Sequence, residues 1–386
     1  MADTPDQNPR SRPGLLPAGL SDLMPGDASR EAAAISSILG SFRGMGYLRV
    51  KPPLVEFEDT LLADGPGASL AGNSFRVMDP QSGQMMAIRA DMTAQIARIA
   101  STRLQHQERP LRLAYSGDVL RVTPDPLNPE RQLTQVGAEM IGAHQIGHDA
   151  EVAVAALAAL QDAGVARLTI DLGAPRLLAA ITEADSDLQQ AVTAKDHMLV
   201  KRYGGDAGDA LCRLLDMPMQ TAAQLAAEVK SLAAVLPAPA AAMLNGLAEM
   251  AALIRAAMPD VMVTIDPLES RGFDYHHGVG FAIFSPGIRG ELGRGGRYRT
   301  HLEDTIGEES TGVTLYLERV LRALKSTPSP SLLYIPHSAG LALLVAKMRE
   351  GHACRFGSLD AKTPQDEARS WHCTHMLIDG QITPIS

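Results

Sequence analysis

Apolar residues near the start of the chain recur at the spacing of a helix. Between residues 28 and 46 they fall three or four positions apart, at Ile35, Ile38, Leu39, Phe42 and Met45. This pattern predicts an amphipathic helix that packs one face against a core. Gly44 and Gly46 mark its end, and a short strand from Tyr47 to Val50 is expected to follow.

The next segments predict strands joined by turns. Residues 75–89 form two strand-like arms around the turn sequence DPQSG, which predicts a hairpin. After a helix predicted at about 93–103, residues 111–122 and 131–142 predict two longer strands, joined by the proline-rich loop TPDPLNPE. Strands linked in this way indicate an antiparallel sheet.

A long helical region follows. The alanine-rich segment EVAVAALAALQDAG predicts a helix that ends at Gly164, and ARLTIDLG after it predicts a buried strand. Residues 175–258 are rich in Ala, Leu and Met and poor in aromatic residues, so we expect an all-helical insertion. The first 13 residues are polar and predict a disordered leader.

Strands resume at VMVTIDP and RGFDYHHGVGFAIF. The glycine-rich GELGRGGRY lacks the Lys and Ser/Thr of a phosphate-binding loop and predicts an ordinary turn between strands. GVTLYLERVLRAL, residues 312–324, predicts a helix. STPSPS, residues 326–331, has the composition of a linker, and residues 332–386 predict a small C-terminal domain of strand-helix-strand order.

Polar residues lie on one face of the strand predicted at 131–142. Side chains alternate between the two faces of a strand. The even face is mostly apolar and suited to packing against a helix: Thr134, Val136, Ala138 and Met140. The odd face carries Arg131, Leu133, Gln135, Gly137 and Glu139. Carboxylate and amide groups flanking a glycine predict the floor of a pocket, and an edge strand with one solvated face is the alternative.

Two adjacent histidines stand in the strand-like segment RGFDYHHGVGF. As neighbours on a strand they face opposite ways and cannot bind one metal ion. His276 shares a face with Gly278 and Gly280, where a ligand could approach. His277 shares a face with Tyr275 and is expected to be a structural histidine of the core.

The C-terminal region gathers His and Cys residues whose spacing matches no zinc-ligand pattern: His352, Cys354, His372, Cys373 and His375. We therefore expect no metal site and no cofactor.

Composition limits the function classes. The 386 residues are 45% hydrophobic, enough for a substantial core, and the formal net charge of -9 disfavours nucleic-acid binding. No apolar run approaches the length of about 20 residues that a membrane span needs. Three cysteines, odd in number and far apart, fit a reducing compartment, so we expect a cytoplasmic protein.

Several motifs, in order, resemble the class II aminoacyl-tRNA synthetases and most closely histidyl-tRNA synthetase, over about residues 14–325. They are GYLRVKPPLVEFED for the first motif, IRADMTAQIAR for the amino-group contact, GDVLRVTPDPLNPERQLTQVGAE for the second motif, RGFDYHHG for the histidine-specific motif and TGVTLYLER for the third. The resemblance implies an α+β fold, with an antiparallel sheet flanked by helices, and a dimer built through the first motif.

By the same resemblance, a set of residues would bind histidine. Asp91 and Thr93 would contact its amino group, Arg121 and Gln135 its amino and carboxylate end, and Glu139 its imidazole. Arg271 and Tyr275 would complete the wall, and His276 replaces the second tyrosine of the motif.

The nucleotide-binding motifs depart from the family pattern. Arg121 is followed by Val122 and Thr123 instead of a glutamate two residues later, and the loop TPDPLNPE carries two carboxylates and no cation. Arg319 of the third motif is kept, but Tyr316 replaces the glycine that normally lies near the adenine. The C-terminal region is also too short for an anticodon-binding domain. No nucleic-acid partner is expected.

A synthetase-like chain with these departures resembles the family of regulatory subunits of ATP phosphoribosyltransferase. The resemblance implies a non-catalytic chain that joins the short-form catalytic subunit in a hetero-octamer, activates it in the first step of histidine biosynthesis, and takes part in feedback inhibition by histidine. The alternative is an enzyme, either a truncated histidyl-tRNA synthetase or an amino-acid-adenylating ligase, because the two phosphate-binding arginines of the class are present.

Overall fold

The computed structural model describes residues 14–63, 65–124, 129–182, 185–217, 222–270, 272–273, 275–300, 307–325, 331–360 and 363–385. The predicted leader, most of the predicted linker and the centre of the TPDPLNPE loop lie outside these ranges. The chain divides into two compact units, Met1–Lys325 and Ser326–Ser386.

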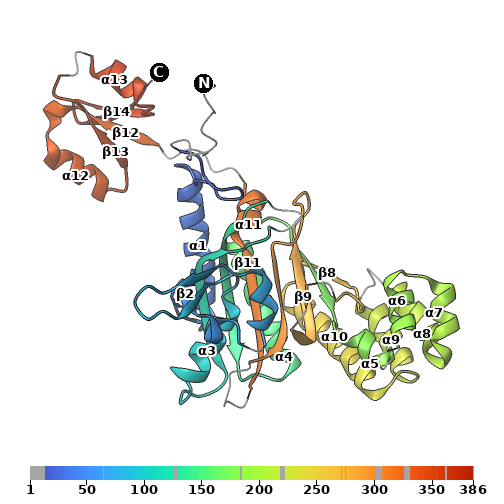
Figure 1. Cartoon of the computed structure of the whole chain (residues 1–386). Coiled ribbons are helices and arrows are strands. Elements are labelled where there is room, and N and C mark those ends of the chain that lie inside the picture. Colours follow the sequence, from blue (N-terminus) through green and yellow to red (C-terminus); the bar gives the residue numbers. More distant parts are fainter. Residues whose placement is uncertain are drawn as a thin grey trace, which may run out of the picture. The chain divides into compact units, whose positions relative to one another are not determined.

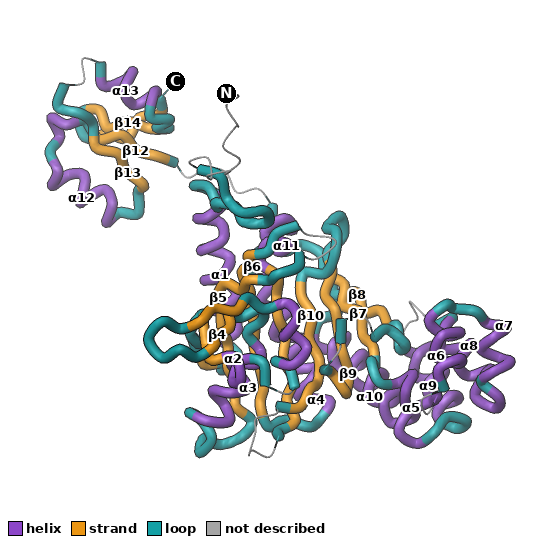
Figure 2. The backbone as a smooth tube through the Cα atoms, in the orientation of Figure 1, coloured by secondary structure: helices purple, strands orange, loops and turns teal. Residues whose placement is uncertain are grey.

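An eight-stranded sheet forms the centre of the first unit (Figures 1 and 2). In spatial order its strands are β1 (Leu48–Arg49), β5 (Leu111–Leu120), β6 (Gln132–Ile141), β11 (Glu309–Tyr316), β10 (Gly293–Arg299), β9 (His276–Phe284), β7 (Thr169–Gly173) and β8 (Met262–Ile265). The pairings from β5 through to β7 are antiparallel, which confirms the predicted sheet, and the two outer pairings are parallel.

Helices cover one face of the sheet. α1 (Asp27–Gly44) and α4 (Ile146–Asp162) contact each other and the central strands. The even face of β6 packs here, with Val136 and Met140 in one buried cluster with Ile38 and Phe42 of α1. The predicted amphipathic helix and its packing partner are therefore confirmed.

The other face of β6 is also buried. Leu133 lies in a cluster with Tyr115 of β5 and with Met92 and Ile96, which belong to or precede α3 (Thr93–Thr102). The alternative of an edge strand with a solvated face is wrong, because β6 lies between β5 and β11. Beside α3, the predicted hairpin forms part of a small antiparallel sheet, β2 (Val55–Phe57), β4 (Met85–Ile88) and β3 (Arg76–Met78), with α2 (Glu58–Leu61) and the short helix η1 (Ala68–Asn73).

The region predicted as an insertion is helical in all its described elements. They are α5 (Leu177–Thr182), α6 (Ser186–Thr193), α7 (His197–Tyr203), η2 (Gly205–Ala207), α8 (Gly208–Leu215), α9 (Ala222–Ala233) and α10 (Ala238–Ala257). In Figure 1 α6 to α9 gather to one side of the sheet, and α10 leads back to it, in contact with α4, β8 and β9.

The expectation that no apolar run approaches a membrane span was wrong. α10 is 20 residues long and apolar enough by length and composition, with a mean hydropathy of 1.2 over its best window. Much of it is nevertheless buried inside the first unit, including Leu244, Leu247 and Ile254. A core helix passes the same test, so this helix is weak evidence for a membrane.

The second unit is a four-stranded sheet with helices. Its strands in spatial order are β13 (Ala353–Phe356), β12 (Leu332–Ile335), β14 (His375–Ile378) and β15 (Gln381–Pro384), and its helices are η3 (His337–Ala339), α12 (Leu341–Arg349) and α13 (Pro364–Ser370). β12 pairs in parallel with β13 and β14 through helical connections, so the predicted strand-helix-strand order is confirmed.

Two predictions of local structure near the end of the first unit were wrong. The first part of the helix predicted at 312–324 is β11, and only α11 (Leu317–Ala323) is helical. The predicted glycine-rich turn contains β10. Its glycines let neighbouring side chains approach closely: a Cβ on Gly295 would lie 2.4 Å from the ring of Phe281, and one on Gly296 would lie 2.8 Å from that of His276.

Candidate functional site

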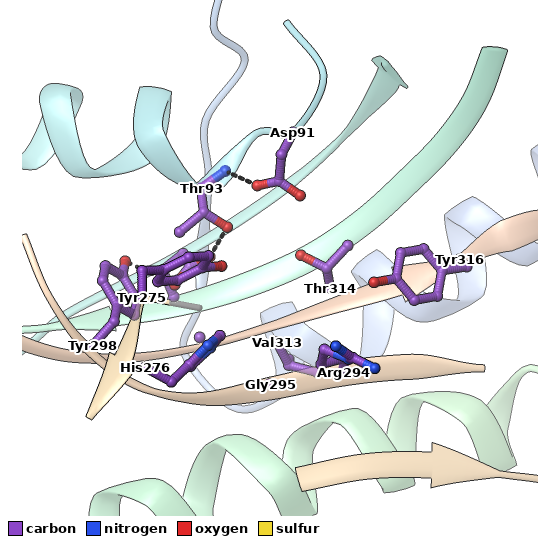
Figure 3. Close-up of a pocket in the computed structure, with 12 residues that line it drawn as sticks. Asp91, Thr93, Tyr275, His276, Arg294, Gly295, Tyr298, Val313, Thr314 and Tyr316 are labelled. Carbon is purple, nitrogen blue, oxygen red and sulfur yellow. Dashed lines mark hydrogen bonds between the residues drawn. The ribbon is translucent and has the colours of Figure 1, made fainter. Parts of the chain in front are cut away.

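A small cavity lies over the centre of the sheet, beneath the N-terminus of α3 (Figure 3). It is lined by Asp91, Thr93, Glu139, Tyr275, His276, Arg294, Gly295, Tyr298, Gly312, Val313, Thr314 and Tyr316. Its volume of about 40 Å³ has room for roughly three water molecules.

Glu139 forms the floor of this cavity, as the parity of β6 predicts. Its carboxylate is buried and accepts hydrogen bonds from the hydroxyls of Tyr298 (3.0 Å), Thr93 (3.1 Å) and Tyr115 (3.3 Å). Burial raises the pKa of Glu139 to about 8, and nearby Asp91 acts in the same direction, although the three hydroxyls oppose the shift. The floor is therefore a protonatable acid surrounded by fixed hydroxyl donors.

Asp91 and Thr93 also line the cavity, and a third predicted residue holds them. The side chain of Asp91 accepts from the Thr93 backbone N–H at 2.8 Å through one oxygen and from the Gln135 amide at 2.8 Å through the other. Gln135 is fully buried, and its carbonyl oxygen accepts from the backbone N–H of Met92 at 3.1 Å. Gln135 is not among the residues that line the cavity.

The histidine pair behaves differently from its predicted arrangement. β9 begins at His276, so Tyr275 precedes the strand and its ring stacks on that of His276, with centroids 4.3 Å apart. Both rings line the cavity, as Figure 3 shows. His277 is not a core residue: its side chain is 37% exposed, and Nε2 lies 2.8 Å from Oε2 of Glu309. The alternation rule failed for Tyr275 because it applies only inside a strand.

His276 is buried and lacks a hydrogen bond at one nitrogen. The residue is 4% exposed, and among the described residues no partner reaches its Nδ1. Burial, with the positive charges of Arg294 and His277, lowers the pKa of His276 to about 3. The ring is therefore neutral at physiological pH.

Like Gln135, the predicted residue Arg121 does not line the cavity. Arg121 donates from Nε to the backbone carbonyl of Ala90 at 3.3 Å, and Arg271 lies outside the described residues. Sequence reasoning missed Tyr115, Tyr298, Arg294 and Thr314, of which all but Tyr115 line the cavity. Parity within β10 and β11 would have identified Tyr298 and Thr314 if both segments had been recognised as strands.

A tyrosine lies among the arginines that the class uses for nucleotides. The ring of Tyr316 is 5.3 Å from the guanidinium carbon of Arg319, and its pKa is raised to about 12 by burial and by Glu291, with Arg121 and Arg294 opposing. Arg319 donates to the backbone carbonyl of Glu291 at 3.2 Å. The neighbouring cavity, of about 450 Å³, includes Asp171, Glu269 and Glu291 in its lining besides two arginines. Carboxylates beside a triphosphate would repel it.

No group of three or more His, Cys, Asp or Glu side chains suited to a metal ion occurs in the described part of the chain. In the second unit, His375 instead bonds through Nδ1 to Ser331 at 2.8 Å, and Cys373 is buried.

Comparisons with known proteins identify the relatives of this chain. The family model of histidyl-tRNA synthetase matches residues 19–320. An ATP phosphoribosyltransferase regulatory subunit of Rhodospirillum centenum is 44% identical over 379 residues, which cover 96% of both chains. The one of Paramagnetospirillum magneticum is 43% identical over 370 residues, covering 94% of this chain and 96% of the relative.

Solved structures agree on the fold. An ATP phosphoribosyltransferase regulatory subunit/histidyl-tRNA synthetase from Bacillus halodurans superimposes with a TM-score of 0.80 at 20% identity and covers 95% of this chain and 98% of its own. Histidyl-tRNA synthetase from Nostoc gives 0.75 at 14% identity, covering 95% and 91%. These identities show the fold alone, whereas the sequence relatives show the family. The chain belongs to the family of ATP phosphoribosyltransferase regulatory subunits, which has the fold of histidyl-tRNA synthetase.

Proposed function

We propose that this chain is a non-catalytic regulatory subunit of ATP phosphoribosyltransferase, in the first step of histidine biosynthesis. It activates a short-form catalytic subunit within a cytoplasmic hetero-octamer, in which it forms a synthetase-like dimer. Histidine binds in the Glu139 cavity and mediates feedback inhibition. The names of the close relatives support the regulatory role.

The buried carboxylate of Glu139 is the observation that supports histidine as the ligand. An imidazole ring presents an N–H donor, and a buried carboxylate is its natural acceptor. Because the pKa of Glu139 is about 8 and that of an unperturbed histidine side chain about 6.5, the empty site and the ligand together carry one proton that the two groups can share. Asp91, at the other side of the cavity, suits a ligand amino group.

Ligand entry provides the regulatory coupling. Tyr275 and Tyr316 line the cavity, and in this proposal their rings move when histidine binds. A ligand that binds one arrangement better than another shifts the population toward it. A coupling of about 1–3 kcal/mol, typical of allosteric proteins, then lowers activity of the partner.

The enzymatic alternative is less well supported. The two arginines that clamp ATP in the synthetases are directed at backbone carbonyls in this chain, Arg121 at Ala90 and Arg319 at Glu291. Tyr316 adds a ring where the synthetases have glycine. These contacts favour a chain that has kept a cavity for an amino acid and lost the ability to bind and activate ATP. Pyrophosphate exchange with histidine and ATP tests this directly: clear turnover would reinstate the enzyme.

Co-purification tests the assembly. The chain is expressed with the short catalytic subunit of the same organism, and turnover is measured for the catalytic subunit alone, for the complex, and for the complex with histidine. We expect a stable complex, higher turnover than the isolated catalytic subunit, and inhibition by histidine. Failure to associate, or equal turnover with and without this chain, would contradict the proposal.

A further inference from the structure

Gln135 connects the cavity floor to the segment above it without entering the cavity. It stands on β6, two strand positions from Gly137 and four from Glu139, on the same face. Its side chain is completely buried, and its amide reaches the turn before α3 through Asp91 and the Met92 backbone N–H. Gln135 therefore contacts Asp91, which lines the cavity, but does not line the cavity itself.

The two hydrogen bonds fix which end of the amide points where. Oε1 accepts from the Met92 N–H at 3.1 Å, and Nε2 donates to Oδ2 of Asp91 at 2.8 Å. Rotating the amide by 180° would place its NH₂ against an N–H donor and its oxygen against a carboxylate. The flipped form is therefore strongly disfavoured.

Asp91 is held at both of its oxygens. Oδ2 accepts from Gln135, and Oδ1 accepts from the Thr93 backbone N–H at 2.8 Å. Charge-assisted bonds of this kind are stronger than neutral ones, and two of them fix the plane of the carboxylate. Figure 3 shows Asp91 beside Thr93 at the edge of the cavity. A ligand ammonium group would meet a carboxylate that is already oriented.

We propose that Gln135 is a positioning residue that acts through Asp91 and does not contact the ligand carboxylate. This differs from the role implied by the synthetase resemblance. It rests on the proposed function, because it assumes that histidine occupies this cavity. Removing the amide releases one oxygen of Asp91 and leaves the Met92 N–H without its acceptor, so affinity falls only for ligands that carry an amino group.

Three ligands separate the two roles. Histidine has both an amino and a carboxylate group, histamine lacks the carboxylate, and imidazolepropionate lacks the amino group. Binding of each is measured by calorimetry to the wild-type chain, to Gln135→Leu, and to Gln132→Leu as a control. Gln132 is an exposed residue on the same strand, so its replacement should change nothing. Thermal melting verifies that each variant folds.

We expect Gln135→Leu to bind histidine and histamine about tenfold more weakly, corresponding to about 1.4 kcal/mol, and imidazolepropionate within twofold of wild type. The double variant Asp91→Ala/Gln135→Leu should bind histidine no more weakly than Asp91→Ala alone. Loss for histidine and imidazolepropionate with histamine unchanged would show direct carboxylate contact and overturn the proposal. An equal loss for all three ligands would also overturn it, because it would reduce Gln135 to general support of the fold.

Hydrogen exchange separates this proposal from the proposed function. If the wild-type chain binds none of the three ligands, histidine is not the effector and the proposed function fails. The effect of Gln135 on the segment that carries Asp91 is then measured in the ligand-free chain, as the exchange rate of backbone amides. The backbone amides of Met92 and Thr93 should exchange at least about tenfold faster in Gln135→Leu than in Gln132→Leu. Equal exchange rates would overturn the positioning role whatever the ligand.

Discussion

The hydroxyl of Tyr298 donates a 3.0 Å hydrogen bond to Glu139, although β11 lies between their two strands. The two side chains meet over Gly312, which pairs directly with Glu139 in the neighbouring strand. A Cβ on Gly312 would lie 1.7 Å from Oε2 of Glu139. The absence of a side chain at this one position lets the cavity floor form.

Replacing Gly312 by alanine should therefore disrupt the floor. The added methyl group would collide with the buried carboxylate of Glu139, which accepts hydrogen bonds from three hydroxyls. The carboxylate cannot move away from the methyl group without losing some of these hydrogen bonds. We expect Gly312→Ala to lower the free energy of unfolding by roughly 1–3 kcal/mol and to weaken histidine binding at least about tenfold. Urea denaturation and calorimetry measure the two effects.

Gly40 of α1 provides the control. A Cβ there would meet no atom within 4 Å, and alanine favours a helix over glycine. Gly40→Ala should leave binding unchanged and stability equal or slightly raised. If Gly312→Ala behaved in the same way, the close packing of Glu139 against β11 would be wrong.

The raised pKa of Glu139 makes the free energy of unfolding depend on pH. Between about pH 4.5 and pH 8 the folded chain keeps a proton on Glu139 that the unfolded chain releases. The unfolded state binds fewer protons over this range, so the contribution of Glu139 to stability is complete below about pH 4.5 and is lost as pH rises through 8. Glu318, whose pKa burial raises to about 7, adds a similar slope.

Glu139→Gln isolates this effect, because glutamine keeps the shape and cannot ionise. Urea midpoints measured from pH 5 to pH 9 should fall for the wild-type chain relative to the variant, and the difference should level off above pH 8. Parallel curves for the two proteins would mean that Glu139 has an ordinary pKa.

Arg319 should be structural. Its guanidinium donates to the carbonyl of Glu291 and packs on Tyr316, in a residue only 6% exposed. We expect Arg319→Met to cost roughly 1–3 kcal/mol of stability and to leave activation of the catalytic subunit within about twofold of wild type at a temperature where the variant is folded. Arg322→Met, on the same helix but half exposed, is the control.

Turnover of the reconstituted complex measures activation in both variants. Loss of activation in folded Arg319→Met, with Arg322→Met unaffected, would show that the arginine of the third motif has a role in the assembly.

The spacing of apolar residues predicted most helices and strands of the first unit, because the faces that it marks as apolar are the faces that are buried in the structure. The helix α1 and the strand β6 carry clear periodicity, and each buries the apolar face that its pattern predicts. β11 was predicted as a helix because the apolar spacing of α11 extends backward into it. Its pairing with β6 and β10 decides its structure, and those partners are remote or weakly marked in the sequence.

The site was predictable where one strand defines it. Parity along β6 placed Gln135 and Glu139 on the same inner face, but it could not separate the residue that lines the cavity from the one that supports it. That distinction depends on Asp91, which arrives from a different segment. His277 was assigned to the core for a similar reason, because its partner Glu309 lies 32 positions away on β11.

Feedback inhibition of complexes containing wild-type or Glu139→Gln chain tests the central claim most directly. Turnover of the catalytic subunit is measured against histidine concentration in each complex. We predict equal activation without histidine, and a half-inhibitory concentration raised at least about tenfold in the variant. Identical inhibition curves would contradict the claim that histidine acts through the Glu139 cavity.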